Sequence, residues 1–536
     1  MRITTKVIQH NSVNNINNNK VLQDKLNNQM STEKKIVRPS DDPVVAIRAL
    51  RLRTNVSQVV QYYSKNIPDA ESWMSVTEDA LTTVSSVLTD MISQCTKGSS
   101  EKLTASDRQT ILNELSALRD EVYSTGNADY AGRSVFTGYR TETTLKFTAA
   151  ENKKYSITEQ INNDVIDEIT YVNSDYLNSI NEVNYNTGTN ADIVEQDIAE
   201  NNIYRIRLSY SNVDNEATTN VPTITLMDGT SINAELISNT ATPNPYDEMI
   251  ATDKANEVAL ASTPPGTVTD RAIVIPETGE MLISKSIYEK LMALKDDVTT
   301  ATTDEAEIRI TYEKSRWKLD DLKPEHYFAC TDMSDADTTN WIKYNQDYLR
   351  GLYEKQSIEY DVGLNQSIRV NTTADEVFTH AIGRDVDDLL NSMQGVVDME
   401  TTLKRLNQIK EDLDASDPTY DEKLDIINKQ IDAANKSLTY LKEKNQKLFE
   451  TSITKMQNHL NVANYATTNC GTREKKLELI KNRLMSQKTN FETLQSENEN
   501  IDITDVAIEL KGAELTYQAA LMSTSKILQT SLMNYI

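Results

Sequence analysis

The feature that most constrains this chain is an apolar repeat, every three or four residues, that recurs toward both of its ends. Between residues 56 and 91 this is the spacing of a coiled-coil seam, and residues 503–520 repeat it. Such a pattern predicts long helices that each bury one stripe. For residues 56–122 we expect an intramolecular bundle, whose first helix buries these residues: Val56, Val59, Tyr63, Ile67, Ala70, Met74, Thr77, Leu81, Val84, Leu88 and Met91.

Helix-breaking and helix-capping residues in the N-terminal half predict where its helices begin and end. Pro68 interrupts the first repeat, so we expect a kink or a helix restart there. A second helix should begin near Ser106, because Ser106 and Gln109 fit a capping box. Residues 126–138 then read as a loop. The apolar face of the second helix would consist of Ile111, Leu115, Leu118 and Val122.

Long helices are expected again after about residue 385. One should end near Asp412, ahead of Pro418, and the next should span roughly residues 420–465. Gly471 predicts a break, after which a further helix would cover about residues 472–498.

The two extreme ends carry stripes that lack an obvious partner of their own. Residues 1–36 are rich in asparagine, a poor helix former, so this segment should become helical only when a partner covers it. The C-terminal repeat continues to the last residue. We therefore expect the two ends to pair as helices and neighbouring copies to bury the remainder, although a purely internal role stays open. The residues expected at this assembly interface are Leu22, Leu26, Met30, Ile503, Val506, Leu510, Ala513, Tyr517, Leu521, Leu528 and Leu532.

Between about residues 150 and 365 the pattern changes to one typical of strands. Apolar and polar side chains alternate over residues 204–210, which predicts a half-buried strand. Asp228-Gly229 lies between two alternating runs and predicts a hairpin. Residues 272–275 and 281–283 flank a second turn, and residues 287–295 read as a helix. The predicted fold is thus mainly α, with an inserted α+β (β-rich) central domain.

Charge is distributed unevenly along the chain. The formal net charge is −26, yet residues 1–53 hold ten Lys/Arg against four Asp/Glu, and residues 501–536 hold two against four. The two ends are therefore opposite in sign and should attract each other. The acidic whole argues against nucleic-acid binding. We also expect no membrane insertion and no cleaved signal peptide, because no apolar stretch is long enough.

No pattern of catalytic or metal-binding residues is recognisable. The three cysteines are far apart in sequence, and the four histidines are scattered. The acidic residues 332–337 lack the glycine and distal glutamate of an EF-hand, and Asp41-Asp42 is better suited to capping a helix. We expect no enzyme activity, no catalytic residues, no cofactor and no metal.

Several short motifs, in order along the chain, resemble the flagellin superfamily. The turn at residues 38–43 has the Ser-Asp-Asp-Pro form that is nearer to its hook-associated junction proteins than to filament flagellin. Other matching segments are a glycine–aromatic loop, a return strand at residues 368–371 and a glycine–arginine turn at residues 471–473. Thr32-Glu33 departs from the pattern, because a glycine usually precedes the basic pair. The motif residues are Pro39, Ser40, Asp41, Asp42, Pro43, Gly132, Phe136, Gly138, Asn371, Gly471 and Arg473.

The resemblance implies an organisation and a role. Residues 1–42 with 500–536 would form a terminal coiled-coil assembly domain, 43–148 with 357–499 a helical rod domain, and 149–356 a variable α+β domain exposed on the outside. A protein of this kind is exported without signal cleavage to the extracellular flagellum, where it joins hook to filament. Its implied partners are copies of itself in a ring or tube, the first hook-associated protein, flagellin and an export chaperone.

Two other functions remain open at this point. The chain could be a filament flagellin with an elaborated outer domain, for which the number of copies per flagellum would be decisive. Alternatively, the flagellar ends could be a scaffold for an adhesive or binding insert.

Overall fold

A computed structural model describes residues 5–100, 102–180, 193–215, 221–226, 229–262, 266–295, 308–350 and 356–532. The chain divides into two compact units. The terminal unit combines Met1–Glu71, Glu359–Arg369 and Arg473–Ile536, and the central unit combines Ser72–Ile358 and Val370–Thr472. Two long helices, α3 (Ile67–Gly98) and α11 (Tyr420–Glu499), contribute residues to both units. The mainly α fold with helices at both ends and a β-rich middle is confirmed.

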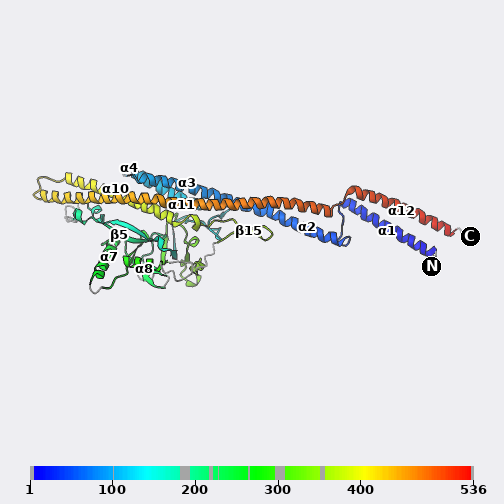
Figure 1. Cartoon of the computed structure of the whole chain (residues 1–536), viewed down its shortest axis with the longest axis horizontal. Helices are drawn as coiled ribbons and strands as arrows, with labels where there is room; N and C mark the ends of the chain where they lie inside the picture. Colours follow the sequence, from blue (N-terminus) through cyan, green and yellow to red (C-terminus); the bar gives the residue numbers. More distant parts are fainter. Residues whose placement is uncertain are drawn as a thin grey trace. The chain divides into compact units, whose positions relative to one another are not determined.

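In the terminal unit the two ends of the chain lie side by side. Helix α1 (Thr5–Thr32) packs against α12 (Ile503–Leu532), and the labelled termini fall at the same end of the pair (Figure 1). An isolated antiparallel bridge between Lys34 and Asn500 fixes the opposite end, so the two helices are antiparallel. The unit also contains α2 (Pro43–Gln61) and the hairpin of β14 (Glu359–Gly363) and β15 (Gln366–Arg369).

Helix α2 starts at the predicted cap. The Asp42 carboxylate accepts hydrogen bonds from the backbone N–H groups of Val44 and Val45 at 3.0 and 3.2 Å, and Pro43 occupies the first turn. The preceding Asp41 carboxylate accepts from Val37 and Arg38, which closes the turn. The predicted capping role is confirmed for Asp42, whereas Asp41 stabilises the turn before the helix.

The break predicted at Pro68 takes the form of a π-helix, η1 (Tyr62–Asn66), that joins α2 to α3. Proline has no N–H and its ring crowds the carbonyl four residues earlier, so a wider turn just before it relieves the conflict. The Asn66 amide fixes this turn by donating to the Asp361 carbonyl at 2.7 Å.

In the central unit, α4 (Ala105–Thr125) packs against α10 (His380–Glu411), and α3 contacts α11, where the Cys470 thiol lies 3.6 Å from the Met74 carbonyl. The intramolecular core predicted for α3 is confirmed, since Met74, Leu81 and Leu88 are fully buried. Helix α4 begins at Ala105, beside the predicted start near Ser106, but the predicted capping pair was wrong. Its capping box is formed by Thr104 and Asp107, two residues before the predicted pair of Ser106 and Gln109.

The helix break predicted at Gly471 was also wrong, and with it the turn assigned to Gly471 and Arg473. Helix α11 runs unbroken through both residues. Glycine lowers helix stability by only about 1 kcal/mol, which the packing of a long helix exceeds. A β-carbon at Gly471 would meet nothing nearer than the Glu78 carboxylate at 3.8 Å, so no close approach explains this glycine.

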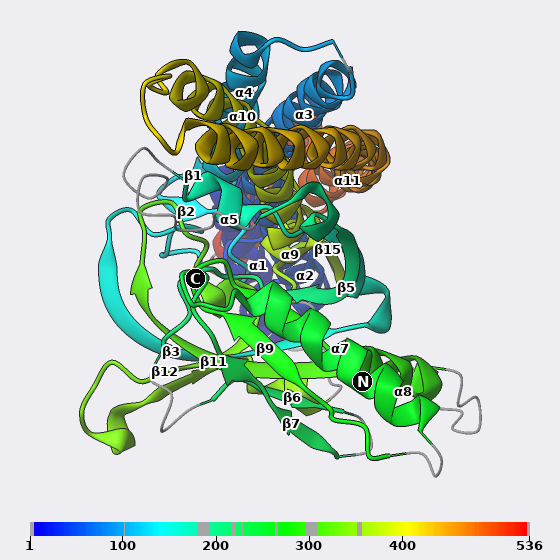
Figure 2. The ribbon, with the colours of Figure 1, turned by 90° about the vertical axis from the view of Figure 1, so that its left-hand side faces the viewer.

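Two sheets make up the insert (Figure 2). Helix α7 (Pro245–Ala261) covers one face of the five-stranded sheet, where Met249 packs on Ile203, Ile273 and Leu282. All neighbouring strands are antiparallel except β8 and β9. The five-stranded order is β4 (Asp167–Val172), β5 (Glu200–Arg207), β10 (Glu280–Ile283), β9 (Ala272–Ile275) and β8 (Glu235–Leu236); the six-stranded order is β13 (Ile342–Tyr344), β12 (Ala329–Asp332), β3 (Glu151–Ile161), β11 (Ile308–Trp317), β6 (Thr223–Thr225) and β7 (Ser231–Asn233).

Both predicted hairpins exist, as β6–β7 and β9–β10. Gly229 has a φ of +83°, the conformation that favours glycine, while Asp228 lies outside the described residues. The predicted helix at 287–295 is α8 (Lys285–Lys295). The remaining elements are short: β1 (Asp129–Tyr130), β2 (Arg133–Ser134), α5 (Asp175–Asn178), α9 (Ala374–Val377), η2 (Asn163–Val165), η3 (Glu195–Asp197), η4 (Pro324–His326), η5 (Thr338–Asn340) and η6 (Gln346–Arg350).

Strand β5 differs from the half-exposed strand that the alternation predicted, because its polar face is also covered. Arg205 is only 6% exposed, and its guanidinium lies 2.8 Å from the Asp388 carboxylate of α10. Arg207 lies 2.9 Å from Asp385, which His459 of α11 also contacts at 2.9 Å. A network of buried ion pairs therefore fixes the insert to the helices of the central unit.

Candidate assembly surface

The contact between α1 and α12 has a small apolar centre. Leu26 is 3% exposed and packs with Val506 and Ala513, and Ile501 and Leu510 cover the edges. Burying these few side chains stabilises the pair only modestly, at roughly 1.5–3 kcal/mol for a fully buried leucine. The predicted pairing of the two ends is observed, but within one copy of the chain few buried apolar contacts stabilise it.

The face of α1 with the lowest exposure is mostly polar, which the apolar stripe did not predict. Its half-buried positions are spaced by three and four residues on either side of the buried Leu26. Leu22 and Met30, predicted on the same stripe, are 45% and 41% exposed. The residues of this inner face are Gln9, Ser12, Ile16, Asn19, Gln23, Leu26 and Gln29.

The predicted interface residues of α12 fall into three groups. Val506 and Ala513 are buried, and Leu510 and Tyr517 are half-buried. Ile503 and Leu521 remain 49% and 44% exposed. The side chains of Leu528 and Leu532 lie outside the described residues.

A second apolar stripe on α12, which we call the outer stripe, was missed from the sequence. Ile508, Leu515 and Met522 are 67%, 59% and 70% exposed, and they are spaced by seven residues. Gly512 and Ala519 lie between them on the same face, so that successive residues of the stripe are four and three positions apart in alternation. At 100° per residue this stripe is on the face opposite Val506 and Ala513. The repeat is visible in the sequence once a second phase is considered.

The segment after α1, residues 33–35, is hydrogen-bonded to the segment before α12, residues 499–501, and we call this region the clasp. Lys35 donates its backbone N–H to the Glu499 carbonyl at 2.8 Å, and Ile501 donates to the Glu33 carbonyl at 3.1 Å. Glu33 has a φ of +55°. This left-handed conformation favours glycine, which explains why the related motif has a glycine where this chain has Thr32-Glu33.

Glu499 is the buried charge of the clasp. Its side chain is 4% exposed, and Arg53 donates to both carboxylate oxygens at 2.7 and 2.6 Å. The Lys34 ammonium lies 3.8 Å away and also donates to the Asn500 side chain at 2.5 Å. The hydrogen bonds and charge of Arg53 lower the pKa of Glu499.

The motif residues of the central unit are structural. Phe136 is 1% exposed and packs edge to face on Phe378 at 4.8 Å. Gly132 and Gly138 have φ values of +77° and +62°. Asn371 is fully buried, and its side chain accepts from the Ile358 N–H and donates to the Gln356 carbonyl, both at 2.8 Å.

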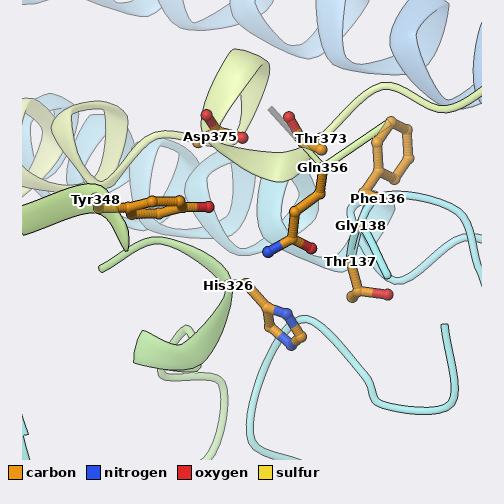
Figure 3. A pocket seen from close by; sticks show the side chains of 8 residues that line it. All are labelled: Phe136, Thr137, Gly138, His326, Tyr348, Gln356, Thr373 and Asp375. Atoms are coloured by element: carbon orange, nitrogen blue, oxygen red, sulfur yellow. The ribbon is translucent and has the colours of Figure 1, made fainter. Parts of the chain in front are cut away.

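A small pocket lies beside this loop in the central unit (Figure 3). The Nε2 of His326 pairs with the Thr144 carbonyl at 3.2 Å, while its Nδ1 has no hydrogen-bond partner among the described residues. Burial lowers the pKa of His326 to about 3, so the imidazole is neutral. The pocket is lined by Phe136, Thr137, Gly138, His326, Tyr348, Gln356, Thr373 and Asp375.

The described part of the chain contains no group of three His, Cys, Asp or Glu side chains placed to hold a metal ion. Nor does it contain a helix both long and apolar enough to cross a membrane. Cys95, Cys330 and Cys470 are buried free thiols, and burial raises the pKa of Cys95 to about 12.

The N-terminal part of the chain is similar to known proteins. Residues 3–141 match the bacterial flagellin N-terminal helical region. The chain is 31% identical over 144 residues to flagellar hook-associated protein 3 of Escherichia coli (strain K12), and 31% identical over 143 residues to that of Salmonella typhimurium (strain LT2). These matches cover 27% and 26% of this chain and 45% of each relative. The predicted resemblance to hook-associated members of the flagellin superfamily is confirmed.

Among solved structures, the chain is similar to the flagellar junction protein FlgL from Legionella pneumophila. The identity is 11%, the TM-score is 0.26, and the match covers 81% of this chain and 99% of that one.

Proposed function

This chain carries a flagellin-type N-terminal helical region and resembles flagellar hook-associated protein 3, and from that premise we propose that it is a structural subunit of the bacterial flagellum, joining hook to filament. It would be exported to the outside of the cell without a cleaved signal, with an export chaperone. Its neighbours would be further copies of itself, the first hook-associated protein and flagellin.

The observation that carries the proposal is the incomplete burial of the paired terminal helices. In the part of the pair that the structure describes, Leu26, Val506 and Ala513 form the buried centre, whereas Val21, Ile508 and Met522 are each at least 67% exposed. Exposed apolar patches mark interaction sites, and Ile508, Leu515 and Met522 form one such stripe on α12. Polymerisation through the paired N- and C-terminal helices would cover them.

Substitution within the pair tests this assembly role. Leu510→Asp places a charge at the half-buried edge of the α1–α12 contact, and Lys511→Asp places the same charge on the adjacent exposed position. We expect the Leu510 variant to be missing from flagella while the Lys511 variant enters them. Thermal unfolding of the central unit should be the same in both proteins. Normal incorporation of the Leu510 variant would contradict the assembly role.

Removal of the gene tests the position in the flagellum. A cell without a junction subunit should build hooks and release flagellin into the medium. A cell without its filament protein would instead secrete no flagellin. The number of copies per flagellum gives a second measure, since a junction ring needs few copies and a filament needs a great many.

A further inference from the structure

The exposed face of α2 is basic and apolar at once. Val44 and Ile47 are 60% and 53% exposed, and Arg48 and Arg51 lie on the same side, opposite the buried Ala46 and Ala49. We call Val44, Ile47, Arg48 and Arg51 the basic face.

Helix α2 itself carries no acidic residue that could balance this face. The sequence from residue 43 to residue 68 contains four Lys or Arg and no Asp or Glu. Arg53 is paired with Glu499, but Arg48 and Arg51 have no ion pair within the described part of the chain. Unpaired guanidinium groups beside exposed apolar side chains are typical of a binding surface, because arginine is enriched at protein interfaces.

The outer stripe of α12 has the opposite character. Asp505 and Glu509 lie one turn before and beside Ile508, and neither carboxylate has an ion pair in the part of the chain that the structure describes. Gly512 adds a second observation, since nothing within 4 Å would meet a β-carbon there. A glycine inside a helix lowers its stability by about 1 kcal/mol, and here no contact within the chain accounts for it.

We propose that the basic face of α2 in one copy binds the outer stripe of α12 in the next copy. Ile508, Leu515 and Met522 would pack beside Val44 and Ile47, with Gly512 and Ala519 leaving room for the larger side chains of α2. Asp505 and Glu509 would pair with Arg48 and Arg51. This inference rests on the proposed assembly function and names the surfaces that meet.

Different surfaces of the two copies take part in this contact, so it is heterologous. A heterologous contact repeats from copy to copy and generates a ring or a helical array instead of a closed dimer. Both apolar stripes are short, and each contact is accordingly weak. Because every copy makes the contact twice, a closed ring gains from both, which suits a subunit that assembles only at high local concentration.

Disulfide capture tests the contact in assembled flagella. A strain without its own copy of the gene would express two tagged forms, Ile47→Cys and Leu515→Cys, and mild oxidation would follow. The native cysteines are buried and should not react. We expect the mixed 47–515 product to dominate. A control pair with Val258→Cys, 71% exposed on α7, should give no product with Leu515→Cys.

Each outcome of the capture experiment has one meaning. If both cysteine forms enter flagella but oxidation gives only 515–515 products, or no disulfide product, this inference is overturned and the flagellar role remains. Failure of tagged wild-type protein to enter flagella would instead overturn the proposed function.

Charge exchange provides an independent test. Arg48→Glu with Arg51→Glu should reduce incorporation at least about tenfold, because charge pairs across an interface select the partner. Adding Asp505→Arg and Glu509→Arg to the same chain should restore it, since both surfaces are present on every copy. A mixture of exchanged and wild-type copies should not form mixed assemblies. Absence of restoration, with circular dichroism unchanged, would contradict the pairing.

Discussion

The clasp allows one prediction to be worked out from distances and exposure. Replacing Arg53 with Met keeps much of the side-chain volume and removes both donors to the Glu499 carboxylate. Arg53 is 58% exposed at its side chain, whereas Glu499 is 4% exposed. The substitution therefore leaves the buried partner, not the exposed one, without its main counter-charge.

The expected cost follows from that asymmetry. A hydrogen bond to a charged group contributes a net of about 1.5–3 kcal/mol, and a buried acceptor that loses its donor carries a similar desolvation penalty. The exposure of Arg53 reduces the benefit, and Lys34 at 3.8 Å replaces part of it. We expect a loss of about 2 kcal/mol in the free energy of opening the clasp. This corresponds to about 30-fold in the opening equilibrium.

Amide hydrogen exchange measures that equilibrium directly. The N–H groups of Lys35 and Ile501 are bonded only while the clasp is closed. In the Arg53 variant their protection should fall about 30-fold at pH 7. Arg51→Met, an exposed arginine on the same helix without a partner among the described residues, is the matched control and should change nothing.

Acid should remove the difference between wild type and variant. The pKa of Glu499 is lowered in the folded protein, so its ionised form stabilises the clasp above the unfolded value of about 4.3. That contribution is lost as the pH falls through the lowered pKa. Equal protection in the two proteins at pH 7, or the same loss in the Arg51 variant, would refute the reasoning.

Three further predictions concern the central unit and α2. Gly138→Ala should destabilise the central unit by about 2 kcal/mol in denaturant unfolding. The φ of +62° is strained for alanine, and the new β-carbon would lie 2.2 Å from the Gln356 side chain. Gly132→Ala, which has no neighbour within 4 Å, should destabilise the unit by about 1 kcal/mol. Asp42→Ala should lower the stability of α2 by about 1 kcal/mol, and Asp42→Ser should restore most of it, as followed by exchange in its first turn. The stability of the central unit should fall as the pH drops from about 6.5 toward 3. The pKa of His326 is about 6.5 in the unfolded chain and about 3 in the folded one, so the unfolded chain binds the proton first. His326→Gln should reduce the dependence of the melting temperature on pH.

The helical frame could be predicted from the sequence because its helices are long and strongly periodic. The stripe of α3, the cap at Asp42 and both hairpins were found for that reason. Boundaries were less certain where two local patterns competed. Thr104 and Asp107 fit a capping box as well as Ser106 and Gln109 do, and spacing alone could not choose between them.

Other features depend on tertiary structure and could not be predicted from the chain itself. Glycine disfavours the interior of a helix, so Gly471 predicts a break, yet the packing of α11 outweighs this weak local preference. Arg205 and Arg207 have the pattern of a solvent-facing row, but acidic residues far along the sequence bury them. The polar inner face of α1 has no apolar periodicity, so the sequence pattern did not predict it.

That polar face has a consequence for how the terminal helices associate. Within one chain, α1 is held mainly near its C-terminal end, by Leu26 and by the clasp at residues 33–35. Toward its N-terminus the inner face presents Gln9, Ser12 and Asn19, which contribute little apolar burial. The pair should therefore open progressively away from the clasp. Apolar side chains of α1 that point outward, including Val13 and Val21, would become buried only when another copy covers them, so completing the helix pair and adding a subunit are the same step.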